Sequence, residues 1–110
     1  MLRVGERWRN DVRTATAELR ADALPDGPVL HIPQRKGEIA YRFMDGALWR
    51  RANMNAEWIQ VLGKVKSSRM EFDKRAEVAA WRWEVELVTP KRNSQVRPLF
   101  TFEAVPAIRQ

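Results

Sequence analysis

The first part of the chain carries apolar residues at a helical spacing. No Pro or Gly interrupts residues 6–24, and Pro25 disfavours helix at the residue before it. One apolar residue every three or four positions places the set on one face of an α-helix. We therefore predict an amphipathic helix over about residues 2–23, packed through a stripe of Val4, Trp8, Val12, Ala15 and Leu19.

The expected start of this helix lacks the usual N-terminal signals. Its first turns carry Arg3 and Arg7, whose charge is unfavourable at the positive end of a helix dipole, and no capping residue precedes them. Such a start is typical of the interior of a helix. We expect the segment to continue a longer helix.

The rest of the chain alternates between apolar and polar residues, as strands do. In residues 38–44, Ile39, Tyr41 and Phe43 share one face, and Asp45-Gly46 then gives a strong hairpin signal. Residues 58–65 suit either a short helical turn or a strand. The expected strands are 29–32, 38–44, 47–54, 69–73, 78–88 and 98–104.

These elements predict a single α+β domain over residues 1–110. No second helix is available for a crossover, so the strands, at about 28–105, are expected to form an antiparallel meander with the helix on one face. The expected core consists of Trp8, Val12, Leu19, Ile39, Tyr41, Phe43, Leu62, Phe72, Trp81, Trp83, Val85, Phe100 and Phe102.

The composition excludes several kinds of functional site. The 110 residues contain no Cys and one His, which excludes disulfides, thiol catalysis and Cys-based zinc sites and leaves little for a His-based metal cluster. No apolar run approaches the length of about 18 residues that a membrane-spanning helix needs, and the N-terminus does not read as a signal peptide. We expect no metal and no cofactor.

Candidate catalytic residues are few. His31 lies in an apolar run without a Ser or Asp beside it, and we interpret it as a solvent-facing strand residue or a satisfied polar group. Glu84 and Glu86 could pair for acid–base chemistry, but Arg82 shares their strand face. A solvated charged face is the simpler interpretation, and the chain is not expected to be an enzyme.

The net charge of +6 favours an anionic partner, but the charge is spread evenly. Residues 1–55 and 56–110 each contain ten basic and seven acidic residues. Arg82 must point away from Trp81 and Trp83, whereas Trp49 and Arg51 share one face of their strand. We therefore take Trp49, Arg50 and Arg51 as a possible partner-contact surface.

Four segments in order resemble one protein superfamily. They are residues 8–15, with the pattern hydrophobic-R-x-D-V-R-x-A; residues 39–50, with I-x-Y-x-hydrophobic followed by G-x-L-x-R; residues 61–72, with L-x-x-V and a later Phe; and the late strand 81–87. This order is similar to the soluble head of a minor pilin or pseudopilin of the type IV pilus and type II secretion superfamily. The J-type minor pseudopilins are the most similar.

The resemblance implies a pilin-like head and a non-enzymatic role. The chain would be a subunit of a pilus-like fibre for type II secretion or type IV pilus assembly. Its partners would be other pilin or pseudopilin subunits. It would lie at the periplasmic, extracytoplasmic face of the inner membrane, anchored by an N-terminal transmembrane helix that this sequence does not include. The alternative is a small nucleic-acid-binding module that uses Trp49, Arg50, Arg51, Lys64 and Lys66.

Overall fold

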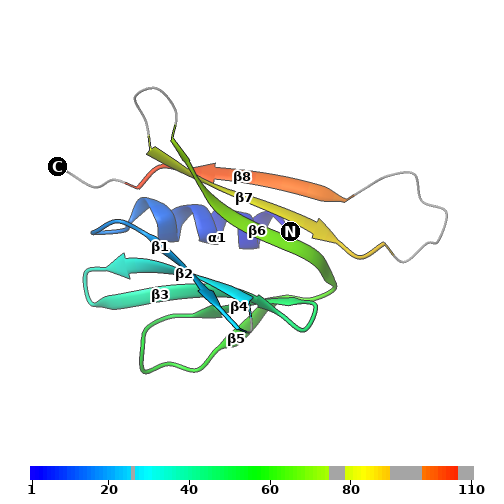
Figure 1. Ribbon diagram of the computed structural model, residues 1–110, viewed down its shortest axis with the longest axis horizontal. Coiled ribbons are helices and arrows are strands. Elements are labelled where there is room, and N and C mark those ends of the chain that lie inside the picture. The colour runs from blue at the N-terminus through cyan, green and yellow to red at the C-terminus, as the bar shows by residue number, and fades with distance from the viewer. Residues whose placement is uncertain (26, 75–78, 90–97, 107–110) are drawn as a thin grey trace.

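The computed structural model consists of one helix and eight strands, and it describes residues 1–25, 27–74, 79–89 and 98–106 (Figure 1). A five-stranded antiparallel sheet has the order β1-β2-β3-β4-β5, and a three-stranded antiparallel sheet has the order β6-β7-β8. The helix is α1 (Leu2–Arg13). The strands are β1 (Arg20–Leu24), β2 (Gly27–Gln34), β3 (Gly37–Met44), β4 (Ala47–Arg51), β5 (Ile59–Leu62), β6 (Val65–Lys74), β7 (Ala79–Leu87) and β8 (Leu99–Ala104).

The prediction of a helix over residues 2–23 is wrong beyond Arg13. The Thr14 hydroxyl donates to the Asn10 carbonyl at 2.9 Å at the helix end, and Arg20–Leu24 form strand β1. Strand β1 pairs antiparallel with β2, an interaction that the local pattern of residues 2–23 does not reveal. Tertiary pairing here overrides helix propensity.

The hairpin prediction at Asp45-Gly46 is confirmed. Asp45 and Gly46 have positive φ angles of 52° and 69°, as a two-residue hairpin turn of this kind requires, and they join β3 to β4. The turn fixes the register Phe43↔Leu48 and Tyr41↔Arg50. Directly opposed residues share a sheet face, so Tyr41 and Arg50 point the same way.

The expected single meander is divided in two. Residues 58–65 contain β5, a turn at Gly63 and Lys64, and the first residue of β6. Lys64 has a φ of 54°, and after it the chain leaves the five-stranded sheet and begins the three-stranded one. The expected strand 78–88 corresponds to β7, and Val78 lies outside the described residues.

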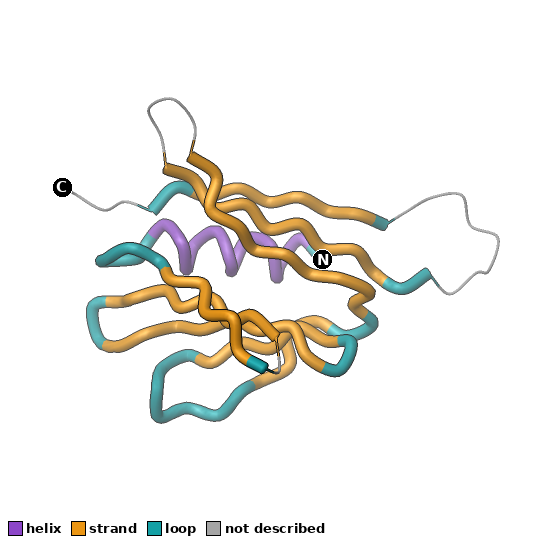
Figure 2. Tube along the Cα trace, viewed as in Figure 1, coloured by secondary structure: helices purple, strands orange, loops and turns teal. Residues whose placement is uncertain are grey.

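Helix α1 runs between the two sheets and contacts both (Figure 2). Its fully buried Trp8 lies 5.8 Å from Trp83 of β7, and Trp83 in turn stacks at 5.3 Å on Phe102 of β8, measured between ring centroids. Gly5 faces the Phe102 ring so closely that an added Cβ would lie 2.1 Å from it. The α+β arrangement, with the helix packed on antiparallel sheets, is thereby established.

Most of the expected core is buried, but the prediction that Phe72 belongs to it is wrong. Phe72 is 53% exposed because it lies near the end of β6, where its ring contacts Trp81 at its edge. Three further positions of the expected core, Phe43, Leu62 and Phe100, are only partly buried at its margin.

Candidate interaction surfaces

A buried ion pair fixes the helix to the five-stranded sheet. The Asp11 carboxylate of α1 accepts hydrogen bonds from Arg50 Nε at 2.9 Å, from Arg50 Nη2 at 3.2 Å and from the Tyr41 hydroxyl at 2.5 Å. We call these three residues the Asp11 cluster. The side chains of Asp11 and Arg50 are 6% and 16% exposed. The cluster determines which turn of the helix meets strands β3 and β4.

The electrostatics of the Asp11 cluster favour one charge state. Burial, together with the neighbouring Asp11 carboxylate, raises the pKa of Tyr41 well above its usual range, so the phenol remains a donor. Burial lowers the pKa of Arg50, but hydrogen bonds and attraction from Asp11 outweigh that effect and leave the pKa raised. Arg50 is therefore a permanent cation paired with Asp11.

The predicted packing stripe is buried almost throughout. Trp8 and Val12 are fully enclosed, Ala15 and Leu19 are buried although they follow the helix, and Val4 is half-buried against the core. The stripe therefore faces the interior as predicted. Its last two members do so from the connection between α1 and β1.

The three residues of the predicted partner-contact surface do not lie together. Arg50 points inward to Asp11 and cannot contribute to an outer contact in this conformation. Trp49 and Arg51 lie on the opposite face of β4, where Trp49 Nε1 donates to the Met44 carbonyl at 3.0 Å. The prediction that Arg50 belongs to a partner-contact surface is therefore wrong, because its side chain binds Asp11 of the helix.

On the outer face of the five-stranded sheet, two arginines lie over the indole ring of Trp58. The guanidinium carbons of Arg51 and Arg42 lie 4.8 and 5.5 Å from the Trp58 ring centroid, within the range of cation–π attraction. Arg42 is also the cross-strand partner of Trp49. We call Arg42, Trp49, Arg51 and Trp58 the Arg–Trp surface. Arg42 could have been found from the hairpin register, whereas no sequence signal points to Trp58.

The same face holds the chain's one His in a charged cluster. His31 Nδ1 lies 2.6 Å from Glu38 Oε1, and its Nε2 lies 2.9 Å from Asp22 Oδ2. Arg20 completes the set with a 3.2 Å contact to Glu38. We call these four residues the His31 cluster. His31 is a satisfied polar group, as one predicted interpretation has it, and its partners come from β1 and β3.

Hydrogen bonding keeps Glu38 ionised. Burial raises the pKa of Glu38, but hydrogen bonds from His31 and Arg20 outweigh burial and hold that pKa below its ordinary value. Both ring nitrogens of His31 are occupied by carboxylates, so the imidazole has no free nitrogen with which to abstract a proton from a substrate. The His31 cluster is thus suited to structure and not to general base catalysis.

The pair Glu84 and Glu86 does not form a paired acid–base site. Arg82 Nε lies 3.9 Å from Glu84 Oε1, whereas Glu86 is buried and its Oε2 forms an ion pair with Lys66 Nζ at 3.1 Å. The expectation of a solvated face therefore holds for Glu84 and is wrong for Glu86. Among the described residues, no group of three His, Asp or Glu side chains could hold a metal ion.

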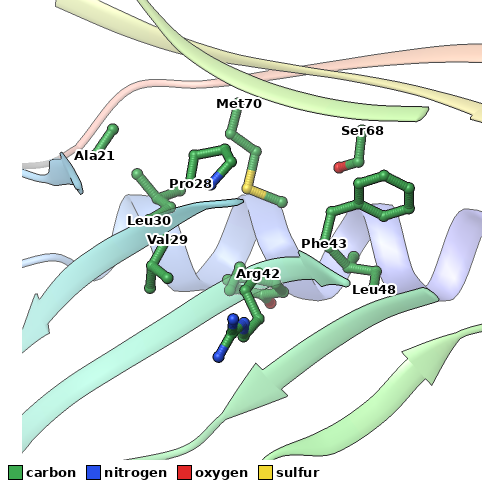
Figure 3. Close-up of a pocket in the computed structure, with 10 residues that line it drawn as sticks. Ala21, Pro28, Val29, Leu30, Arg42, Phe43, Leu48, Ser68 and Met70 are labelled. Atoms are coloured by element: carbon green, nitrogen blue, oxygen red, sulfur yellow. The ribbon is translucent and has the colours of Figure 1, made fainter. Parts of the chain in front are cut away.

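A small crevice opens between the two sheets, beside the helix (Figure 3). Its volume is about 30 Å³, far below the roughly 300–1,000 Å³ of pockets that bind small molecules. Apolar side chains form most of the lining and the Ser68 hydroxyl is a polar member, whereas the Arg42 side chain points away from the crevice (Figure 3); the full set is Ala21, Pro28, Val29, Leu30, Tyr41, Arg42, Phe43, Leu48, Ser68 and Met70.

Comparison of the chain with family models, with curated proteins and with solved structures found no match. In the described part of the chain, no helix combines the length and the apolar character that crossing a bilayer requires.

Proposed function

We propose that this chain is the globular head of a minor pilin or pseudopilin. It acts as a non-enzymatic structural subunit of a membrane-anchored, pilus-like fibre for type II secretion or type IV pilus assembly. The observation that supports this proposal best is the Asp11 cluster, which ties the N-terminal helix to the sheet by a buried, hydrogen-bonded ion pair.

A fibre subunit needs a rigid connection between its helical stem and its head. Apolar packing alone tolerates small rotations of a helix, whereas three hydrogen bonds to one carboxylate hold it in one rotation and one register. Trp8 adds a second attachment, to the three-stranded sheet. The helix is thus held from both sides, as the stem of a fibre subunit would have to be.

The proposal assigns lateral contacts to the Arg–Trp surface. Aromatic residues and Arg are enriched at protein interfaces, and Trp49, Trp58 and Arg51 lie together on the outer face of the five-stranded sheet. The partners would be other pilin or pseudopilin subunits. Contacts that join different surfaces of neighbouring subunits generate open helical fibres. The head would lie at the periplasmic face of the inner membrane.

The sequence encoded upstream of Leu2 in the parent gene tests this proposal. A prepilin leader, followed by Glu and about 20 apolar residues that merge into α1, is the expected result. A stop codon or unrelated sequence at that position would contradict the proposal. The measurement requires no folded protein, so it does not depend on the stability of the head.

A nucleic-acid-binding module is the alternative function, and the Arg–Trp surface is the observation that favours it. Arg and Trp side chains can stack on unpaired bases. The five residues expected for this function lie apart, however, because Arg50 pairs with Asp11, Lys64 lies in the turn before β6, and Lys66 pairs with Glu86. Only Trp49 and Arg51 of the five lie on the Arg–Trp surface.

Titration of a single-stranded oligonucleotide, followed by Trp fluorescence at several salt concentrations, separates the two functions. The alternative predicts affinity that falls steeply with salt and is weakened by Arg51→Ala. Arg35→Ala, a substitution of an exposed Arg in the turn between β2 and β3, is the matched control. The pilin proposal predicts no such binding, except in a pilin that takes up DNA.

A further inference from the structure

The His31 cluster requires a doubly protonated imidazole. Both ring nitrogens face carboxylate oxygens, Glu38 at 2.6 Å and Asp22 at 2.9 Å. An ionised carboxylate only accepts hydrogen bonds, so each nitrogen must carry a proton to bond its partner. A neutral ring has one N–H and can satisfy one of the two carboxylates. The arrangement therefore depends on the charge of a single side chain.

The cluster spans three strands and ends on an edge strand. Asp22 and Arg20 belong to β1, His31 to β2 and Glu38 to β3. Every residue of β1 is exposed, and β1 pairs only with β2 in its sheet. In the described part of the chain, β1 makes side-chain polar contacts through Arg20 and Asp22, both with this cluster. Strand β1 thus has little apolar burial to hold it.

We propose that the His31 cluster is a pH-dependent latch that holds β1 on the sheet while His31 is doubly protonated and releases it when the ring becomes neutral. The proposal stands independently of the pilin function, because it concerns the attachment of one strand and names no partner.

The geometry indicates which contact is lost. The side chains of His31 and Glu38 are 13% and 15% exposed, whereas Asp22 is 48% exposed. The neutral ring is expected to keep its proton on Nδ1, because the contact to Glu38 is shorter and better shielded from water. Nε2 then presents a lone pair to the Asp22 carboxylate, and the two repel each other. Asp22, and with it β1, loses its attachment.

The other charges around the ring do not supply the missing bond. Arg20 lies directly opposite His31 in the β1–β2 pairing, but its guanidinium is bonded to Glu38. Arg42 and Arg51 lie on the same sheet face and contact Trp58. With a neutral ring, two carboxylates remain at the site and Arg20 bridges only Glu38. Raising the pH therefore weakens the latch.

Release of β1 would change the surface beside the crevice of Figure 3. Ala21, on the opposite face of β1 from Asp22, lines that crevice together with Leu30 and Met70. Ala21 pairs directly with Leu30, which is almost completely buried. Detachment of β1 would expose Leu30 and the apolar lining to solvent.

Solution NMR of the intact chain tests the latch. The imidazole is the only one in the chain, so its carbon and nitrogen shifts report its protonation without overlap. The backbone shifts of Arg20–Leu24 report strand structure. As the pH is raised, the loss of strand shifts in β1 is expected to follow the appearance of the neutral ring, while β7 remains unchanged. Strand shifts in β1 that persist through the ring titration would overturn the proposal.

Two variants and a control sharpen the test. His31→Gln has one amide donor group for two carboxylates, so β1 is expected to be released at every pH, with amide protection at least about tenfold lower than in the parent chain at low pH. Asp22→Asn supplies an amide that can donate to the neutral ring, and should largely remove the pH dependence. Glu18→Gln, an exposed carboxylate just before β1, should behave like the parent chain.

The variants also distinguish release from general unfolding. If His31→Gln unfolds the whole chain, the shifts of β7 change together with those of β1, and Asp22→Asn then provides the decisive comparison. A pH dependence of β1 that is identical in Asp22→Asn and in the parent chain would overturn the proposal.

Discussion

Removal of the Asp11 carboxylate is the perturbation that tests the packing of the helix most directly. In Asp11→Ala, the guanidinium of Arg50 and the hydroxyl of Tyr41 lose their acceptor but stay inside the protein. Both groups remain largely shielded from water, so water replaces the lost bonds only in part. We expect a large loss of stability from this one substitution of a buried helix residue.

The size of the loss can be estimated from the contacts. Breaking a buried ion pair by removing one partner costs about 3–5 kcal/mol, because the remaining charge stays desolvated. A chain of this length is stable by about 5–15 kcal/mol. Asp11→Ala is therefore expected to lower the free energy of unfolding by about 3–5 kcal/mol and the Tm by about 10–20 °C. Glu18→Ala, which removes an exposed carboxylate, should change it by less than about 0.5 kcal/mol.

Unfolding in guanidinium chloride, followed by Trp fluorescence, measures these changes, because Trp8 and Trp83 are buried in the core. A double-mutant cycle with Arg50→Met isolates the pair. The double variant is expected to cost less than the two single variants together by at least about 1.5 kcal/mol, since neither charge is left alone. A cost below about 1 kcal/mol for Asp11→Ala, or costs that simply add, would refute the reasoning.

Three further predictions concern packing and pH. A Gly→Ala substitution usually stabilises a helix, but Gly5→Ala should lower the free energy of unfolding by about 1–3 kcal/mol, because its Cβ would overlap the Phe102 ring. The double variant Gly5→Ala with Phe102→Leu should recover part of this loss in the same denaturation assay. Trp8→Ala should cost about 3–5 kcal/mol by calorimetry, since the indole is fully buried between helix and sheet. The pKa of Glu38 is lowered in the folded state, so Glu38 stabilises the fold above its ordinary pKa of 4.5, and this stabilisation is lost as the pH falls below that value. In Glu38→Gln, the free energy of unfolding should therefore fall less steeply with acidification, as denaturation at a series of pH values would measure.

The hairpin and most of the strands, though not β1, could be read from the sequence because their signals are local. Alternation in β3 places Tyr41 and Phe43 on one face, and Asp45-Gly46 fixes the register with β4. From that register alone, Arg50 lies opposite Tyr41 on the inner face. Once the hairpin register is applied to both strands, the sequence itself predicts that Arg50 points inward.

The end of the helix could not be read in the same way. Ala15 and Leu19 continue a helical spacing, and both are buried, yet they lie in the connection to β1. A spacing of three or four residues indicates which side chains face the core, but it does not show that the backbone between them is helical. The pairing of β1 with β2 determined the conformation at this point.

The sequence by itself determined the class of the fold, the positions of most strands, the hairpin turn and most of the core, because each follows from the order of apolar residues along a short segment. Tertiary structure decided the division into two sheets, the pairing of β1 with β2, the pairing of Arg50 with Asp11 and the gathering of Trp58 and His31 with their partners. Arg50 meets Asp11 across 39 positions of the chain, and Tyr41 meets it across 30. The partner of a charged side chain depends on which distant segments folding brings within about 3 Å of it, and no local pattern encodes that distance.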